Sequence, residues 1–204
     1  MNYQIQDTNH INLTVALPAE AKPLLKAFGL IRWQPVESMP IYTGNGIHLC
    51  VTGPGTSAAT LGVQLLNSMT PAGVRTLWLN SGICGHGSLP VGEPLLVERV
   101  IDQERDRSWS LHSRLPIAAV TGPLTCVLTP ESEYQQDMAY DMESAGFIDT
   151  VSAIGGTESI TILKIVSDNP DQPARGISAK RVCDLFEKQI SLIRELVDQL
   201  QHHT

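Results

Sequence analysis

The sequence is poor in basic residues and has no long apolar run. Lysine and arginine number 14 against 21 acidic residues, so the 204-residue chain carries a formal net charge of −7. An acidic surface repels phosphate backbones, which argues against a general nucleic-acid binder. No apolar run approaches the about 20 residues that a membrane-spanning helix needs. We therefore expect neither a nucleic-acid partner nor a membrane partner.

The sequence also lacks clustered cysteines and the pattern of a secretory signal. None of the four cysteines belongs to a Cys-x-x-Cys pair, which argues against a zinc site, and no metal is expected. Residues 1–10 are polar and lack a basic start followed by an apolar stretch. Buried free thiols in a reducing cytoplasm are therefore expected for the cysteines, which are Cys50, Cys84, Cys126 and Cys183.

Segments with strand and helix patterns alternate along the chain. Short apolar and β-branched runs predict strands at 11–17, 41–42, 47–52, 76–79, 95–101, 117–120, 125–128 and 160–166. Apolar residues at helical spacing predict helices at 19–28, 57–69, 141–154 and 178–200. This alternation predicts an α/β fold: one three-layer α/β/α domain over 1–204 with a mixed central sheet. The strands at 11–17, 76–79 and 160–166 are expected to be buried on both faces.

Four distinctive segments directly follow predicted strands. They are 17–20, the glycine-rich turn 53–59, the loop expected at 80–87, and Ser167–Asp168. Ligands bind at the carboxyl ends of strands in sheets of this kind, so these segments are expected to meet at one site. Each also has a purely structural explanation, such as helix-dipole or turn-capping acids. The glycine-rich turn lacks a following lysine and is not a phosphate-binding P-loop.

Five elements, in chain order, resemble the nucleoside phosphorylase and nucleosidase superfamily, most closely the methylthioadenosine/S-adenosylhomocysteine nucleosidases. The two most specific are the Asp-Met-Glu-Ser-Ala element at Asp141–Ala145 and the Ser-Asp element at Ser167–Asp168. The others are an Ala-x-Pro-x-Glu-x-x-x-Leu element at Ala16–Leu24, an approximate glycine turn at Gly53–Ala59, and Gly82–Gly85 followed by Gly92–Glu93.

The resemblance implies hydrolysis of the N-glycosidic bond of a purine nucleoside or 5′-thio-nucleoside, without a cofactor. Asp168 would donate a proton to the departing base, Ser167 would orient Asp168, and Glu20 would activate the water. Loss of a base from a ribosyl centre passes through an oxocarbenium-like state, which nearby carboxylates stabilise. If the carboxyl groups of Glu20, Glu143 and Asp168 lie together, they could therefore stabilise this state.

The resemblance also implies residues that hold the substrate. Glu143 would bind the ribose hydroxyls, with Met142 packed against the sugar. Ile83 and Gly85 belong to the central glycine element and would line the same site. A homo-oligomer, with a dimer favoured, is implied as well.

Two alternatives remain open from the sequence. Phosphorylases of this superfamily hold phosphate with an arginine and a serine near the central glycine element. The matching positions are Asn80 and Ile83, and neither offers positive charge, so water is favoured as the nucleophile. The short stretch between Leu128 and Asp141, where relatives form part of the base pocket, leaves a catalytically degenerate nucleoside-binding protein as the other alternative.

Arg107 and Trp109 lie where the family often closes over the substrate. They are equally consistent with plain surface residues, because the surrounding stretch 102–114 is highly charged.

Overall fold

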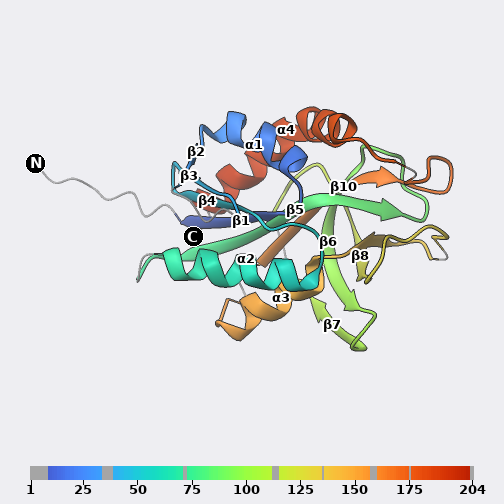
Figure 1. Ribbon diagram of the computed structural model, residues 1–204, viewed down its shortest axis with the longest axis horizontal. Coiled ribbons are helices and arrows are strands. Elements are labelled where there is room, and N and C mark those ends of the chain that lie inside the picture. The colour runs from blue at the N-terminus through green and yellow to red at the C-terminus, as the bar shows by residue number, and fades with distance from the viewer. Residues whose placement is uncertain are drawn as a thin grey trace, which may run out of the picture.

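The computed structural model describes residues 9–33, 39–70, 73–111, 115–134, 136–156, 160–174 and 176–202. These residues form one mixed ten-stranded sheet with helices on both sides (Figure 1). The strands are β1 (His10–Val15), β2 (Ile31–Arg32), β3 (Ile41–Gly44), β4 (Ile47–Val51), β5 (Thr76–His86), β6 (Pro94–Asp102), β7 (Arg107–Ser110), β8 (Val120–Cys126), β9 (Ala139–Asp141) and β10 (Ile160–Asp168). The helices are α1 (Pro18–Phe28), α2 (Thr56–Met69), α3 (Ser144–Ala153) and α4 (Ala179–His202).

The helices pack in pairs on opposite faces of the sheet. Helices α1 and α4 cover one face, and α2 and α3 cover the other (Figure 1). Strand β10 is mostly apolar because it is buried on both faces: Leu163 and Ile165 face the core under α4, while Ile162 and Val166 face the core under α3. A strand buried on both faces has no polar side. The predicted α/β class and mixed sheet are thereby confirmed.

The sheet closes on itself at one end. The strand order is β10-β6-β8-β9-β5-β1-β4-β3-β2, with β7 on β6, and β10 also pairs with β5 in parallel. Strands β5, β10, β6, β8 and β9 thus form a closed ring in which each strand pairs with two others. The sequence pattern predicted the sheet but not this ring.

The predicted loop at 80–87 is wrong, because β5 continues as far as His86. Strand β10 pairs with this part of β5 as far as Gly85, and β9 pairs with Gly85 and His86. Gly82 and Gly85 lack side chains where other groups approach closely. A Cβ atom at Gly85 would lie only 2.8 Å from both a carboxylate oxygen of Asp168 and the ring of Tyr134.

Three other predicted elements need correction. The two strands expected at 117–120 and 125–128 are one strand, β8, which runs through Pro123. This proline lies opposite a register shift in β6 between Val97 and Arg99, where a missing N–H is tolerated. The helix expected at 141–154 begins only at Ser144, because Ala139–Asp141 pairs as β9. Strand β7 was not predicted within the charged stretch 102–114.

The cysteines are free thiols, as predicted, but not all of them are buried. Cys50, Cys84 and Cys126 lie in the core, whereas Cys183 is partly exposed on α4 beside Glu187. Cys183 lies outside the apolar stripe by which α4 packs against the sheet. None of the helices within the described ranges is long and apolar enough to cross a membrane.

Candidate active site

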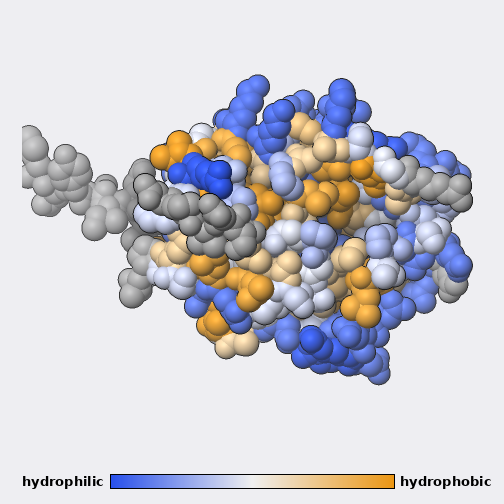
Figure 2. Space-filling view, viewed as in Figure 1, coloured by the Kyte–Doolittle hydropathy of each residue, from blue (hydrophilic) through white to orange (hydrophobic). Residues whose placement is uncertain are grey.

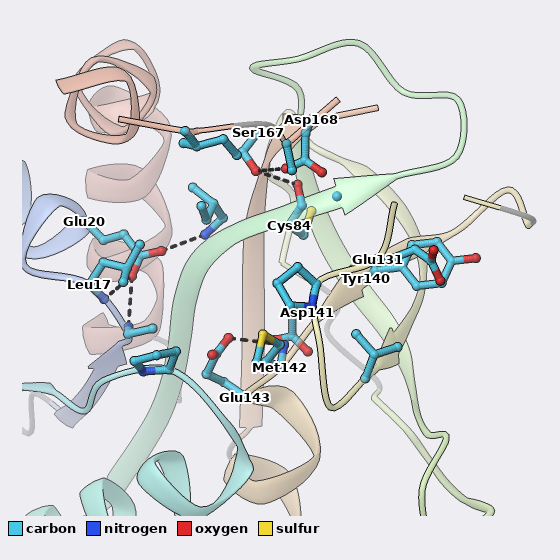
Figure 3. A pocket seen from close by; sticks show the side chains of 18 residues that line it. Leu17, Glu20, Cys84, Glu131, Tyr140, Asp141, Met142, Glu143, Ser167 and Asp168 are labelled. Carbon is cyan, nitrogen blue, oxygen red and sulfur yellow. Dashed lines mark hydrogen bonds between the residues drawn. The ribbon is translucent and has the colours of Figure 1, made fainter. Parts of the chain in front are cut away.

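A cavity of about 360 Å³ opens where β1, β5 and β10 end (Figure 3). Parallel strands deliver their carboxyl ends to the same edge, so the residues that follow them meet there. The structure brings all the predicted site residues to this one cavity, as expected for a shared cleft: Glu20, Ile83, Gly85, Met142, Glu143, Ser167 and Asp168 line it. Their chemical roles stay predictions.

Glu20 lies in the first turn of α1 and is almost fully buried. One carboxylate oxygen accepts hydrogen bonds from the N–H groups of Ala16 (2.9 Å) and Leu17 (2.8 Å). The other accepts one from the N–H of Ile83, at 2.9 Å. Burial raises the pKa of Glu20 to about 7, although the N–H groups of Leu17 and Ile83 and the Lys164 ammonium lower it. A carboxyl group with this pKa can act as a base near neutral pH.

Glu143 lies between β9 and α3 and contacts the glycine-rich turn. One of its oxygens accepts a hydrogen bond of 2.8 Å from the N–H of Gly55. Gly55 has a φ of 98°, which favours glycine over any other residue. Burial raises the pKa of Glu143, and the neighbouring carboxylate of Asp141 raises it further. The glycine-rich turn therefore donates a backbone hydrogen bond to a protein carboxylate. This agrees with the prediction that the turn is not a phosphate-binding P-loop.

Asp168 ends β10 with both of its carboxyl oxygens engaged. The Ser167 hydroxyl contacts one oxygen, and the Tyr134 hydroxyl donates to the other. The Ser167 oxygen also lies 3.1 Å from the carbonyl oxygen of Cys84. A hydroxyl has one proton, so Ser167 can donate to the carbonyl while accepting from a protonated Asp168, or donate to an ionised Asp168. Ser167 can therefore stay hydrogen-bonded to Asp168 in either case.

The sequence prediction missed Lys164 and the role of Asp141. Their side chains form an ion pair of 2.7 Å, and each is only 1% exposed. Burial alone lowers the pKa of Lys164, but Asp141, Glu143 and Glu20 together raise it above its ordinary value. Asp141 also accepts hydrogen bonds from the N–H and hydroxyl of Ser144 at the start of α3. The available signal was a single charged residue inside the otherwise apolar run of β10.

The charge of the cavity is one-sided. Among the lining residues that the structure describes, none is lysine, arginine or histidine. The carboxylate-bearing lining residues are Glu20, Glu131, Asp141, Glu143 and Asp168. Lys164 lies behind this lining and is committed to Asp141. Within the described ranges, no group of three His, Cys, Asp or Glu side chains could hold a metal ion.

Three residues weighed from the sequence lie away from the cavity lining. Arg107 pairs with Asp149 at 3.0 Å and lies over the ring of Trp109, at 5.0 Å from its centre. This favours the surface interpretation of both. Asn80 donates to the Thr14 hydroxyl at 3.0 Å and is buried between strands.

Solved structures with this architecture cover nearly the whole chain. The 5′-methylthioadenosine nucleosidase of Arabidopsis thaliana superposes with a TM-score of 0.81 at 16% identity, covering 97% of this chain and 98% of that one. The chain has the fold of the methylthioadenosine nucleosidases. No protein-family model and no curated protein matches the sequence.

Two further structures support the same fold. The 5′-methylthioadenosine/S-adenosylhomocysteine nucleosidase of Streptococcus pneumoniae, solved with a transition-state inhibitor, gives a TM-score of 0.74 at 14% identity and covers 96% of this chain and 100% of that one. The futalosine hydrolase of Helicobacter pylori gives 0.75 at 17% identity, with 94% and 98% covered. The resemblance inferred from short motifs is thereby confirmed for the fold.

Proposed function

We propose that this protein hydrolyses the N-glycosidic bond of a purine nucleoside or 5′-thio-nucleoside and releases the base. The observation that carries the proposal is the convergence of Glu20, Glu143 and Asp168 in one cavity, from three distant parts of the chain. Buried carboxyl groups around a ribosyl centre stabilise its developing positive charge. The names of the structural neighbours support the same substrate class.

Each carboxyl group has one task in this proposal. Asp168 gives its proton to the imidazole part of the purine as the bond from C1′ to the base breaks, and the base takes the bonding electrons. A water molecule attacks C1′ and passes a proton to Glu20. Glu143 accepts hydrogen bonds from the ribose hydroxyls. Release of the Glu20 proton and reprotonation of Asp168 complete the cycle, so the net reaction consumes one water.

The charge of the cavity favours water over phosphate. Inorganic phosphate is an anion at neutral pH and binds where cations or free N–H groups gather. The described lining offers five carboxylate side chains and no basic one. The structure thus agrees with the sequence argument from Asn80 and Ile83.

Release of free base from adenosine or 5′-methylthioadenosine is expected to proceed at the same rate with and without inorganic phosphate. The sugar product should be a free reducing sugar and not a ribose 1-phosphate, because water attacks C1′. Chromatography of both products checks this. Dependence on phosphate would make the protein a phosphorylase, and binding of either nucleoside without release would leave a nucleoside-binding protein.

Activity is expected to depend on the ionisation of Glu20. A base must be ionised to accept a proton from water, so kcat/KM should fall as the pH drops below about 7. Far below that value the loss approaches about tenfold per pH unit. A profile from pH 5 to 9, with folding followed by circular dichroism, checks this. A profile that stays flat over the two pH units below 7 would remove Glu20 from this role.

We further propose a purine base, a homodimer and a cytoplasmic location. The purine base is supported by the substrates in the names of the structural neighbours.

Figure 2 shows hydrophobic residues gathered in the middle of one face, with hydrophilic residues above and below. Exposed apolar side chains such as Leu61 (55%) and Leu128 (61%) support association with a second copy. The free thiols support a reducing compartment.

A further inference from the structure

Tyr134 contacts Asp168, the acid proposed to protonate the leaving base. Tyr134 is not itself among the described residues that line the cavity. It lies in the short connection between β8 and β9, and it is 7% exposed. Its hydroxyl donates to one oxygen of Asp168, while Ser167 occupies the other. Pro130 and Glu131 of the same connection do line the cavity. The short connection therefore forms a cavity wall and also holds Asp168.

Two features show that the structure is built around this contact. Tyr134 has a φ of 47°, a left-handed conformation that is costly for a bulky residue and that is often found at functional sites. Its ring also lies against Gly85, where a Cβ atom would be 2.8 Å from a ring carbon. The backbone of Tyr134 and the missing side chain of Gly85 thus both serve the placement of one hydroxyl.

Tyr134 is suited to hold Asp168 and not to relay its proton. Burial raises the pKa of Tyr134, and the hydrogen bond to Asp168 raises it further. A phenol that keeps its proton so firmly donates a fixed hydrogen bond and does not become a tyrosinate during turnover.

We propose that Tyr134 is a positioning residue for the reaction: its hydroxyl, together with that of Ser167, fixes the Asp168 carboxyl group in the orientation that protonates the leaving base. This inference rests on the proposed function. A carboxyl group that rotates freely would reach the base less often, and small misplacements of a reacting group cost up to about 10²-fold in rate.

The variant Tyr134→Phe separates this role from a structural one. Hydrolysis of the purine nucleoside should slow by about 10- to 100-fold in kcat with little change in KM, because only the acid is disturbed. Hydrolysis of 4-nitrophenyl β-D-ribofuranoside should be unchanged, because 4-nitrophenolate leaves as an anion and needs no proton. In an Asp168→Asn background, Tyr134→Phe should cause no further loss of purine turnover.

Tyr42→Phe is the matched control, since Tyr42 is a partly buried tyrosine of β3 outside the described cavity lining. Equal losses for both substrates, a further loss in the Asp168→Asn background, unchanged purine turnover, or faster turnover in Tyr134→Phe would each overturn the proposal. Faster turnover would show that Tyr134 blocks Asp168. Should Asp168→Asn itself retain full purine turnover, the proposed function fails, whatever Tyr134→Phe does.

Discussion

Replacing Asp168 with asparagine is expected to lower the kcat for a purine nucleoside by about 10²- to 10⁴-fold, the usual contribution of general acid catalysis. The amide has the shape of the acid but cannot protonate the departing base. It can still contact the Ser167 and Tyr134 hydroxyls that hold the carboxyl group in place. KM should therefore change less than kcat. Steady-state kinetics on the purified variant, with thermal unfolding to verify the fold, measures both.

Glu143→Gln should behave differently, because it should weaken both binding and turnover. One oxygen of Glu143 already accepts the Gly55 N–H, at 2.8 Å. The single oxygen of a glutamine can keep that bond, but its NH₂ group then faces the ribose hydroxyls and can only donate to them. KM should rise while kcat falls.

Asp149→Asn is the matched control for these two variants. Asp149 is a partly exposed carboxylate that pairs with Arg107 outside the described cavity lining. Its removal should leave both kinetic constants close to those of the unaltered protein. If a folded Asp168→Asn protein turned over as fast as the control, the hydrolytic role would be lost and a nucleoside-binding role would lead.

Glu20, Ser167 and Asp168 were predictable from sequence because they lie at or just beyond the ends of strands with a clear apolar pattern. Asp168 is the last residue of β10, two positions after its apolar run ends, and Glu20 follows β1 in the first turn of α1. The carboxyl ends of parallel strands lie at one edge of the sheet, so residues at the ends of different strands could be expected to lie close together. The Asp-Met-Glu element needed the family resemblance, because β9 has only three residues and gives no periodic signal.

Contacts that depend on the register of distant strands were not predictable. Lys164 lies opposite Gly82 only because β10 and β5 pair in that register, which places its ammonium beside Asp141 and Glu20. Tyr134 lies in a connection without helical or strand periodicity, so nothing local indicated that it reaches Asp168. Ring closure by β5 and β10 is likewise a long-range pairing that local patterns do not specify.

Replacing Lys164 with methionine is expected to destabilise the fold by about 3–5 kcal/mol, the usual cost of leaving one member of a buried ion pair alone. The melting temperature should fall by roughly 6 to 20 °C for a domain of this size. Asp141 would remain buried with an uncompensated charge, beside the carboxyl group of Glu143. The loss of a cation that lowers the pKa of Glu20 should also move the acid limb of the activity profile to higher pH. Differential scanning calorimetry and the pH profile measure the two effects.

The double variant Lys164→Met with Asp141→Asn keeps this prediction decisive. It removes both charges, and the oxygen of the new amide can still accept a hydrogen bond from Ser144, so more than half of the lost stability should return. Lys180→Met is the matched control, because Lys180 forms an equally short ion pair of 2.6 Å with Asp184 but is 84% exposed. An exposed pair contributes little, so its loss should barely change the melting temperature. Equal shifts for Lys164→Met and Lys180→Met, or no recovery in the double variant, would show that the charge of Lys164 does not stabilise the base of the cavity.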